Sequence, residues 1–149
     1  MAAMRALLLG LLALAAAGGC RHTDASPPAG EGLAELRWRF EPGPTDEGIP
    51  ATTVVLRYDG TGTLDTGDGP REFTLGPIAM SGLAGAVQDA KPFAGKTFGD
   101  AACETKCSHD SLQVKPVRGA PWTLARHGQG APKPVDEVFF RLLHGVRPR

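Results

Sequence analysis

Charged and apolar side chains alternate strictly in one short segment near residue 40. The apolar members are Leu36, Trp38 and Phe40, and the residues between them are Arg37 and Arg39. A period of two gives an apolar and a polar face only when the chain is extended, so this segment is predicted to be a β-strand. A strand with one wet face belongs in an antiparallel sheet that is covered on one side. No other segment constrains the fold as much.

Further strands are expected where β-branched or alternating segments border turns. Asp59-Gly60 lies between two of them, and Arg118 to Pro121 separates two more. The expected strands cover residues 33–40, 52–58, 63–66, 111–117 and 122–126, with a further short strand around 72–75. A three-residue loop in the first hairpin would set Leu64 opposite Leu56, with Tyr58 on the same buried face.

Two segments show the helical period of 3.6 instead. Residues 82–90 are predicted to form a weak helix, capped by Ser81, that buries Leu83, Ala86, Val87 and Ala90. A clearer helix begins at Pro134 and ends at Gly145, with a buried stripe of Val135, Val138, Phe139 and Leu142. These elements predict an α+β fold: an antiparallel sheet of about five strands with two helices packed on one face. The element order resembles that of small envelope domains such as the emfourin-like protease inhibitors.

The N-terminal segment is predicted to be a targeting signal. Arg5 is its only charge, and residues 6–17 are apolar apart from Gly10. At about 1.5 Å per residue, a helix over this run would span roughly 18 Å, short of the ~30 Å hydrocarbon core of a membrane. A short apolar run behind one positive charge is typical of a secretory signal peptide.

The end of this segment, Ala17-Gly18-Gly19-Cys20, resembles the lipobox of bacterial lipoproteins, although Ala17 stands where that family usually has Leu. The resemblance implies that Cys20 carries a diacylglycerol thioether, that residues 1–19 are removed, and that the protein is fatty-acylated and held on a membrane. Arg21, rather than Asp, follows the cysteine. In the enteric version of the family this favours the outer membrane. The alternative is an ordinary signal peptide on a secreted protein.

Residues 20–32 are expected to form a lipidated flexible tether, and residues 33–149 one small domain. The whole chain has 16 basic and 16 acidic side chains and a net charge of zero. Binding to nucleic acid needs an excess of Lys and Arg, so this composition argues against a nucleic-acid partner.

Two cysteines remain after Cys20, in the segment Cys103-Glu104-Thr105-Lys106-Cys107. Outside the cytoplasm, neighbouring cysteines usually oxidise to each other, so a structural disulfide between Cys103 and Cys107 is predicted. Two alternatives stay open: free or redox-active thiols, and a metal site completed by His109 and Asp110. The latter spacing matches no standard zinc pattern.

No segment carries a specific catalytic or cofactor motif. The segment Ser108 to Ser111 contains the three residue types of a Ser-His-Asp hydrolase triad. A triad needs these side chains to converge in space, whereas consecutive side chains point in different directions. Asp65-Thr66-Gly67 resembles the aspartic-protease signature, yet Asp68 follows it, and a turn explains these residues. The glycine-rich segment 59–69 lacks P-loop and EF-hand spacing. We therefore expect no catalytic residue, no metal and no cofactor.

The leading hypothesis is a membrane-anchored envelope lipoprotein with a non-catalytic binding domain, either an inhibitor or an accessory subunit, that contacts an envelope protein. The alternatives are an enzyme without a recognisable motif and a purely structural envelope protein. Arg37, Arg39 and Arg57 are expected on the wet face of the sheet, either as an anion-binding or partner surface or as a merely solvated face. Trp38 and Trp122 are expected in the core or at its rim.

Overall fold

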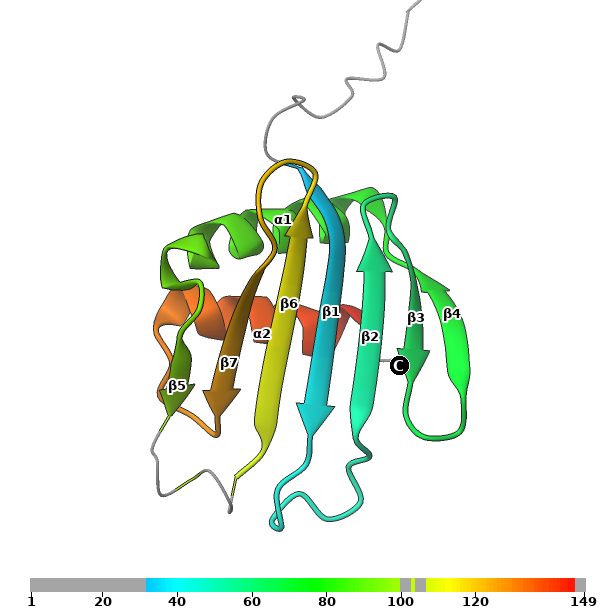
Figure 1. Ribbon diagram of the computed structural model, residues 1–149. Helices are drawn as coiled ribbons and strands as arrows, with labels where there is room; N and C mark the ends of the chain where they lie inside the picture. The colour runs from blue at the N-terminus through cyan, green and yellow to red at the C-terminus, as the bar shows by residue number, and fades with distance from the viewer. Residues whose placement is uncertain (1–31, 100–102, 104–106, 147–149) are drawn as a thin grey trace, which may run out of the picture.

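A seven-stranded sheet and two helices make up the part of the chain that the computed structural model describes, residues 32–99, 103 and 107–146 (Figure 1). The strands are β1 (Leu33–Glu41), β2 (Thr52–Arg57), β3 (Thr61–Asp65), β4 (Pro70–Thr74), β5 (Thr97–Gly99), β6 (His109–Pro116) and β7 (Trp122–His127). Their order across the sheet is β4-β3-β2-β1-β6-β7-β5. The helices α1 (Pro77–Ala90) and α2 (Lys133–Val146) lie together on one face, and a 3-10 turn, η1 (Lys91–Phe93), follows α1.

The α+β class with two helices is confirmed, but the expected sheet of about five antiparallel strands is wrong in two details. The sheet has seven strands, and β5 pairs with β7 in parallel. The physical reason is the length of β5, which spans three residues, Thr97 to Gly99. A segment this short shows no period of two. It becomes a strand because the edge of β7 offers it backbone hydrogen-bonding groups.

The alternating segment that predicts the sheet lies at its centre. β1 pairs with β2 on one side and with β6 on the other, antiparallel to both. Leu36, Trp38 and Phe40 point toward the helices and are buried, whereas Arg37 and Arg39 are exposed on the opposite face. The buried side chains of β2, β6 and β7 continue this core: Val54, Leu56, Leu112, Val114 and Leu124.

The two helices bury the stripes expected of them. Leu83, Ala86, Val87 and Ala90 of α1 are buried, as are Val135, Val138, Phe139 and Leu142 of α2. However, α1 begins at Pro77 rather than near Gly82. Proline is favoured at the first helical position, because its fixed φ is helical and because the backbone N–H that it lacks would have no hydrogen-bond acceptor within the helix there. α2 continues through Gly145 to Val146, which is buried against the core.

The first hairpin has the expected three-residue loop but not the expected register. Leu64 lies opposite Val54, while Gly62 lies opposite Leu56. The loop is Tyr58-Asp59-Gly60, so Tyr58 is 72% exposed instead of buried. Gly60 has a φ of +84°, which favours glycine, and Asp59 Oδ1 accepts hydrogen bonds from both the backbone N (2.9 Å) and Oγ1 (2.7 Å) of Thr61. These bonds lower the pKa of the Asp59 carboxyl.

Candidate functional site

The face of the sheet opposite the helices is polar and carries no helix or strand over it in the described part of the chain (Figure 1). We call it the open face. Its side chains come from alternate positions of the central strands and are exposed. They include Arg37 and Arg39 of β1, Arg57 of β2, and Ser111, Gln113 and Lys115 of β6. The predicted placement of the three arginines on the wet face of the sheet is therefore confirmed.

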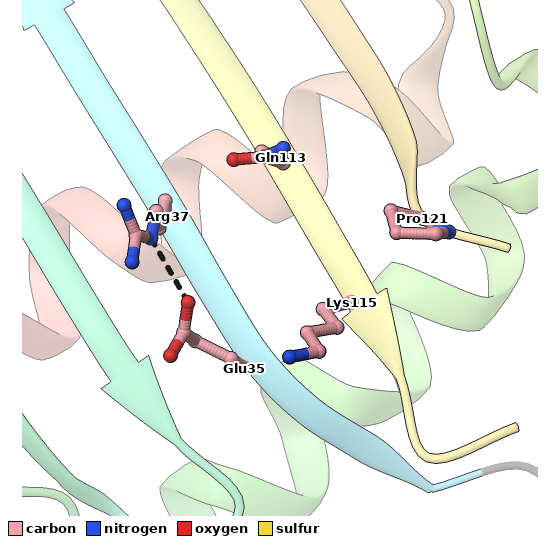
Figure 2. A pocket seen from close by; sticks show the side chains of 5 residues that line it. All are labelled: Glu35, Arg37, Gln113, Lys115 and Pro121. Atoms are coloured by element: carbon pink, nitrogen blue, oxygen red, sulfur yellow. Dashed lines mark hydrogen bonds and ion pairs between the residues drawn. The ribbon is translucent and has the colours of Figure 1, made fainter.

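The open face has a depression near the start of β1 and the end of β6. This depression has a volume of about 260 Å³ and is lined by five residues, whose side chains are drawn in Figure 2: Glu35, Arg37, Gln113, Lys115 and Pro121. Arg37 Nε donates to Glu35 Oε1 at 2.9 Å, so one side of this depression is an ion pair. The Lys115 ammonium and the Gln113 amide belong to the neighbouring strand and supply further donors.

A larger depression of about 400 Å³ adjoins it toward β7 and the segment before β5. Among the described residues, its charged lining residues are Arg37, Arg39 and Lys96, and none of the described residues in its lining is acidic. Hydroxyl and amide groups alternate with these cations: Thr53, Thr97, Ser111, Gln113 and Thr123. Such a surface presents hydrogen-bond donors and positive charge to an approaching ligand.

The arginines of this depression already have carboxylate neighbours on their own strand. Arg37 pairs with Glu35 at 2.9 Å, and Arg39 Nη2 pairs with Glu41 Oε1 at 2.8 Å. The arginine side chains are 59% and 67% exposed. Ion pairs this exposed contribute about 0–1 kcal/mol, so a carboxylate of a partner can replace Glu35 or Glu41 at small cost.

On the buried face, one carboxylate organises a polar network inside the apolar core. Asp110 is 3% exposed. Its Oδ1 accepts a hydrogen bond from Trp38 Nε1 and its Oδ2 one from Arg126 Nε, both at 2.8 Å. Arg126 Nη1 also donates to Asp136 Oδ1 at 2.7 Å, and the guanidinium lies 4.6 Å from the centre of the Phe139 ring. The network therefore ties three strands to the first turn of α2.

Sequence reasoning missed this network, although a signal was present. Asp110 is in phase with Leu112 and Val114, the buried residues of its strand. An acidic residue in phase with a buried stripe requires a cationic or N–H partner inside the fold. Trp38 was expected in the core or at its rim, and at 1% exposure it is in the core.

The structure does not bring together the serine, histidine and aspartate side chains that a hydrolase triad would need. His109 and Ser111 lie on the open face, whereas Asp110 points to the helices. Asp65 Oδ1 accepts a hydrogen bond from the backbone N of Gly67 at 2.8 Å, the turn that its sequence predicts. Cys20 lies outside the described residues.

The Sγ atoms of Cys103 and Cys107 lie at disulfide distance, and their Cα atoms are 5.0 Å apart. The pair packs against glycines of two neighbouring loops. A Cβ on Gly128 would lie 3.1 Å from Cys103 Sγ, and one on Gly43 would lie 2.6 Å from the carbonyl carbon of Cys107. The pair therefore sits at the end of the sheet where β6 begins and β7 ends.

Replacing both Cys103 and Cys107 by serine is expected to lower the free energy of unfolding by about 1–2 kcal/mol, because closing so short a loop removes little entropy from the unfolded chain. Denaturant titration of the variant and of the wild type measures the difference. Adding a reductant to the wild type should give the same loss, and should cause no further loss in the variant. Free thiols at Cys103 and Cys107 in protein taken directly from its native cells would contradict the disulfide.

No group of three His, Cys, Asp or Glu side chains among the described residues is arranged to hold a metal ion. Over the same residues, no helix is long and apolar enough to cross a membrane. Neither a protein-family model nor a curated protein matches the sequence.

Proposed function

We propose that this chain is an envelope lipoprotein, anchored through Cys20, whose folded domain binds a partner protein through the open face of the sheet. The observation that carries the binding function is the 400 Å³ depression, whose described lining residues include three cations and no carboxylate. The lipobox-like sequence before Cys20 supports the anchor, and the apolar run of residues 6–17 supports export.

The shape of the open face favours a macromolecule over a small molecule. Sites for small molecules usually bury most of the ligand in a cleft. Here both depressions lie on the face of a sheet rather than in a cleft, and Arg37 and Gln113 line both of them. A partner surface can cover both depressions at once, with its own side chains reaching into them.

The charges define the chemistry of that partner. Carboxylates are the groups that best complement the three cations of the depression, Arg37, Arg39 and Lys96. The planar guanidinium of arginine binds a carboxylate with two parallel hydrogen bonds. The neighbouring hydroxyl and amide groups match backbone and polar side chains of a polypeptide. The proposed partner is therefore an envelope protein that presents acidic side chains, and the domain acts on it as an inhibitor or an accessory subunit without performing chemistry.

A photo-crosslinking amino acid at Gln113, in the full-length protein in its native membrane, is expected to give one discrete protein adduct. Charge reversal by Arg37→Glu and Arg39→Glu should reduce that adduct about tenfold or more, because like charges across an interface repel. The matched control places the crosslinker at Ile78, which is 91% exposed on α1 and far from the open face in the fold. Immunoblotting and mass spectrometry measure the adducts.

Two results would contradict the proposal. An equal adduct from Ile78, or one that charge reversal leaves unchanged, would exclude the open face as the binding surface. Adducts with lipid or glycan alone would exclude a protein partner.

A further inference from the structure

The most exposed large apolar side chains of the described residues gather at one end of the sheet. They are Ile78, Tyr58 and Val117, which are 91%, 72% and 60% exposed. Tyr58 begins the loop between β2 and β3, Val117 follows β6, and Ile78 is in the first turn of α1. Figure 1 shows these three segments at the same end of the sheet, the top in that view. We call it the apolar end.

The chain enters the folded domain at the same end. The backbone N of Val117 donates to the carbonyl oxygen of Gly32, the first described residue, at 2.7 Å. The backbone N of Tyr58 donates to the carbonyl oxygen of Ala34 at 3.1 Å. Two of the three exposed side chains therefore belong to segments that are hydrogen-bonded to the first residues of the domain.

The helix α1 adds an exposed surface without charge. Leu75, just before the helix, donates its backbone N–H to the carbonyl oxygen of Gly60 at 2.9 Å, so the start of α1 is held against the β2–β3 loop. No charged residue occurs from Pro77 to Gln88. A helix surface that faces water is normally polar. Here the exposed residues of α1 before Gln88 are small or apolar: Pro77, Ile78, Ala79, Ser81 and Gly85.

The length of chain before Gly32 indicates what covers this end. Gly32 follows Cys20, the proposed site of acylation, by twelve positions. Twelve residues span at most about 43 Å even when fully extended. An anchor at Cys20 therefore keeps the apolar end near the bilayer. A second contact with the same bilayer then needs little affinity of its own, because the anchor has already brought the two surfaces together.

The polar residues of the apolar end are compatible with lipid headgroups. Arg57 and Arg118 are exposed beside the apolar side chains, and guanidinium groups bind phosphates with paired hydrogen bonds. Asp59 is the acidic residue of the β2–β3 loop, and its carboxylate accepts hydrogen bonds from Thr61. Tyrosine is enriched where a membrane meets water, since its ring is apolar and its hydroxyl is polar.

We propose that the apolar end contacts the headgroup region of the bilayer to which Cys20 anchors the chain. This inference rests on the proposed anchor but not on the proposed protein partner, because Tyr58, Ile78 and Val117 do not line the depressions of the open face. With this end on the membrane, the strands stand upright on it and the open face points sideways. The open face is then accessible to a partner held in the same membrane.

The test uses the full-length protein in its native membrane, with a photo-crosslinking amino acid at Tyr58. The control places the crosslinker at Ile49, which lies in the β1–β2 loop at the opposite end of the sheet. Growth with radioactive phosphate makes phospholipid adducts detectable, because the acyl anchor itself contains no phosphate. We expect at least about tenfold more phospholipid adduct at Tyr58 than at Ile49, since only the apolar end reaches the headgroups.

Charge substitutions test whether the exposed apolar side chains make the contact. Ile78→Glu together with Val117→Glu should reduce the phospholipid adduct at Tyr58 about tenfold, because a carboxylate loses hydration when it enters the apolar part of the interface. Ile49→Glu is the matched control and should leave the adduct unchanged. Ile78 and Val117 are exposed, so the thermal midpoint of each variant should stay close to that of the wild type.

The outcomes separate this contact from the other proposals. Equal phospholipid adducts at Tyr58 and Ile49 in an acylated protein, or a Tyr58 adduct that survives both glutamates, would overturn the contact and leave the anchor in place. A soluble protein without fatty-acid label would refute the anchor and the contact together. A phospholipid adduct at Tyr58 without a protein adduct at Gln113 would support the contact and contradict only the partner of the open face.

Discussion

Replacing Asp110 by alanine is expected to lower the free energy of unfolding by about 3 kcal/mol, the largest loss that we expect from any single polar side chain in the described structure. The substitution leaves the Trp38 Nε1–H group without its acceptor in the core and removes one of the two carboxylates on Arg126. A buried N–H donor without an acceptor is costly, and so is a half-buried cation that keeps only one of its two carboxylates, Asp136. Denaturant titration measures the loss, and the thermal midpoint should fall by about 10 °C.

The control for this substitution is Asp68→Ala. Asp68 carries the same carboxyl group, but its side chain is 80% exposed and its contact with Arg71 is long, at 4.0 Å. We expect a change within about 0.5 kcal/mol. A second variant, Trp38→Phe, removes the indole donor of this network together with part of a buried ring, so its effect should not add fully to that of Asp110→Ala. Equal stability of the Asp110 and Asp68 variants would contradict the network as a source of stability.

Replacing Cys20 by serine is expected to move the protein from the membrane fraction to the soluble fraction and to abolish its labelling with a fatty-acid analogue. Serine cannot form the thioether that the lipobox resemblance implies. Two or three acyl chains, at about 0.8 kcal/mol per buried methylene, would otherwise hold the chain on the membrane. Fractionation of whole cells, with metabolic labelling, measures both effects.

The double variant Cys103→Ser and Cys107→Ser is the control for the anchor. It also removes two thiols but leaves Cys20 in place, so it should remain labelled and membrane-bound. A wild-type protein that is soluble and unlabelled would end the lipoprotein hypothesis and leave the ordinary secretory signal. Separation of inner and outer membranes then tests the preference for the outer membrane that Arg21 suggests.

The elements that could be predicted are those whose residues carry their own signal. The alternation around Trp38 has the period of a strand, and the apolar stripe through Phe139 has the period of a helix. Both patterns arise because one side of the element faces water and the other faces the core. The elements that could not be predicted are short, or depend on glycines at close contacts. β5 takes its conformation from β7, and the register of the first hairpin depends on a glycine turn at Gly60 and on Gly62, where a Cβ would lie 2.6 Å from the Phe73 ring.

The residues of the candidate sites also divide into those that the sequence predicts and those that it does not. The arginines of the open face were predicted because each follows the period of its own strand. The gathering of Tyr58, Ile78 and Val117 at one end of the sheet was not, since they belong to three separate segments and Tyr58 was expected to be buried. The partners of Asp110 were equally hidden, because Trp38 is 72 positions away from it.

By itself, the sequence determined local properties: which of the longer segments are strands or helices, which face of each one is apolar, and the likeness of the N-terminus to a lipoprotein signal. Each of these depends on side chains within a few residues of one another. The tertiary structure alone decided the strand order, the parallel edge strand, the Asp110 network and the apolar end. These depend on which strands become neighbours, and that is settled by how well distant apolar faces pack and how fully buried polar groups are paired. Two residues become a site only when pairing of the strands places them a few ångströms apart.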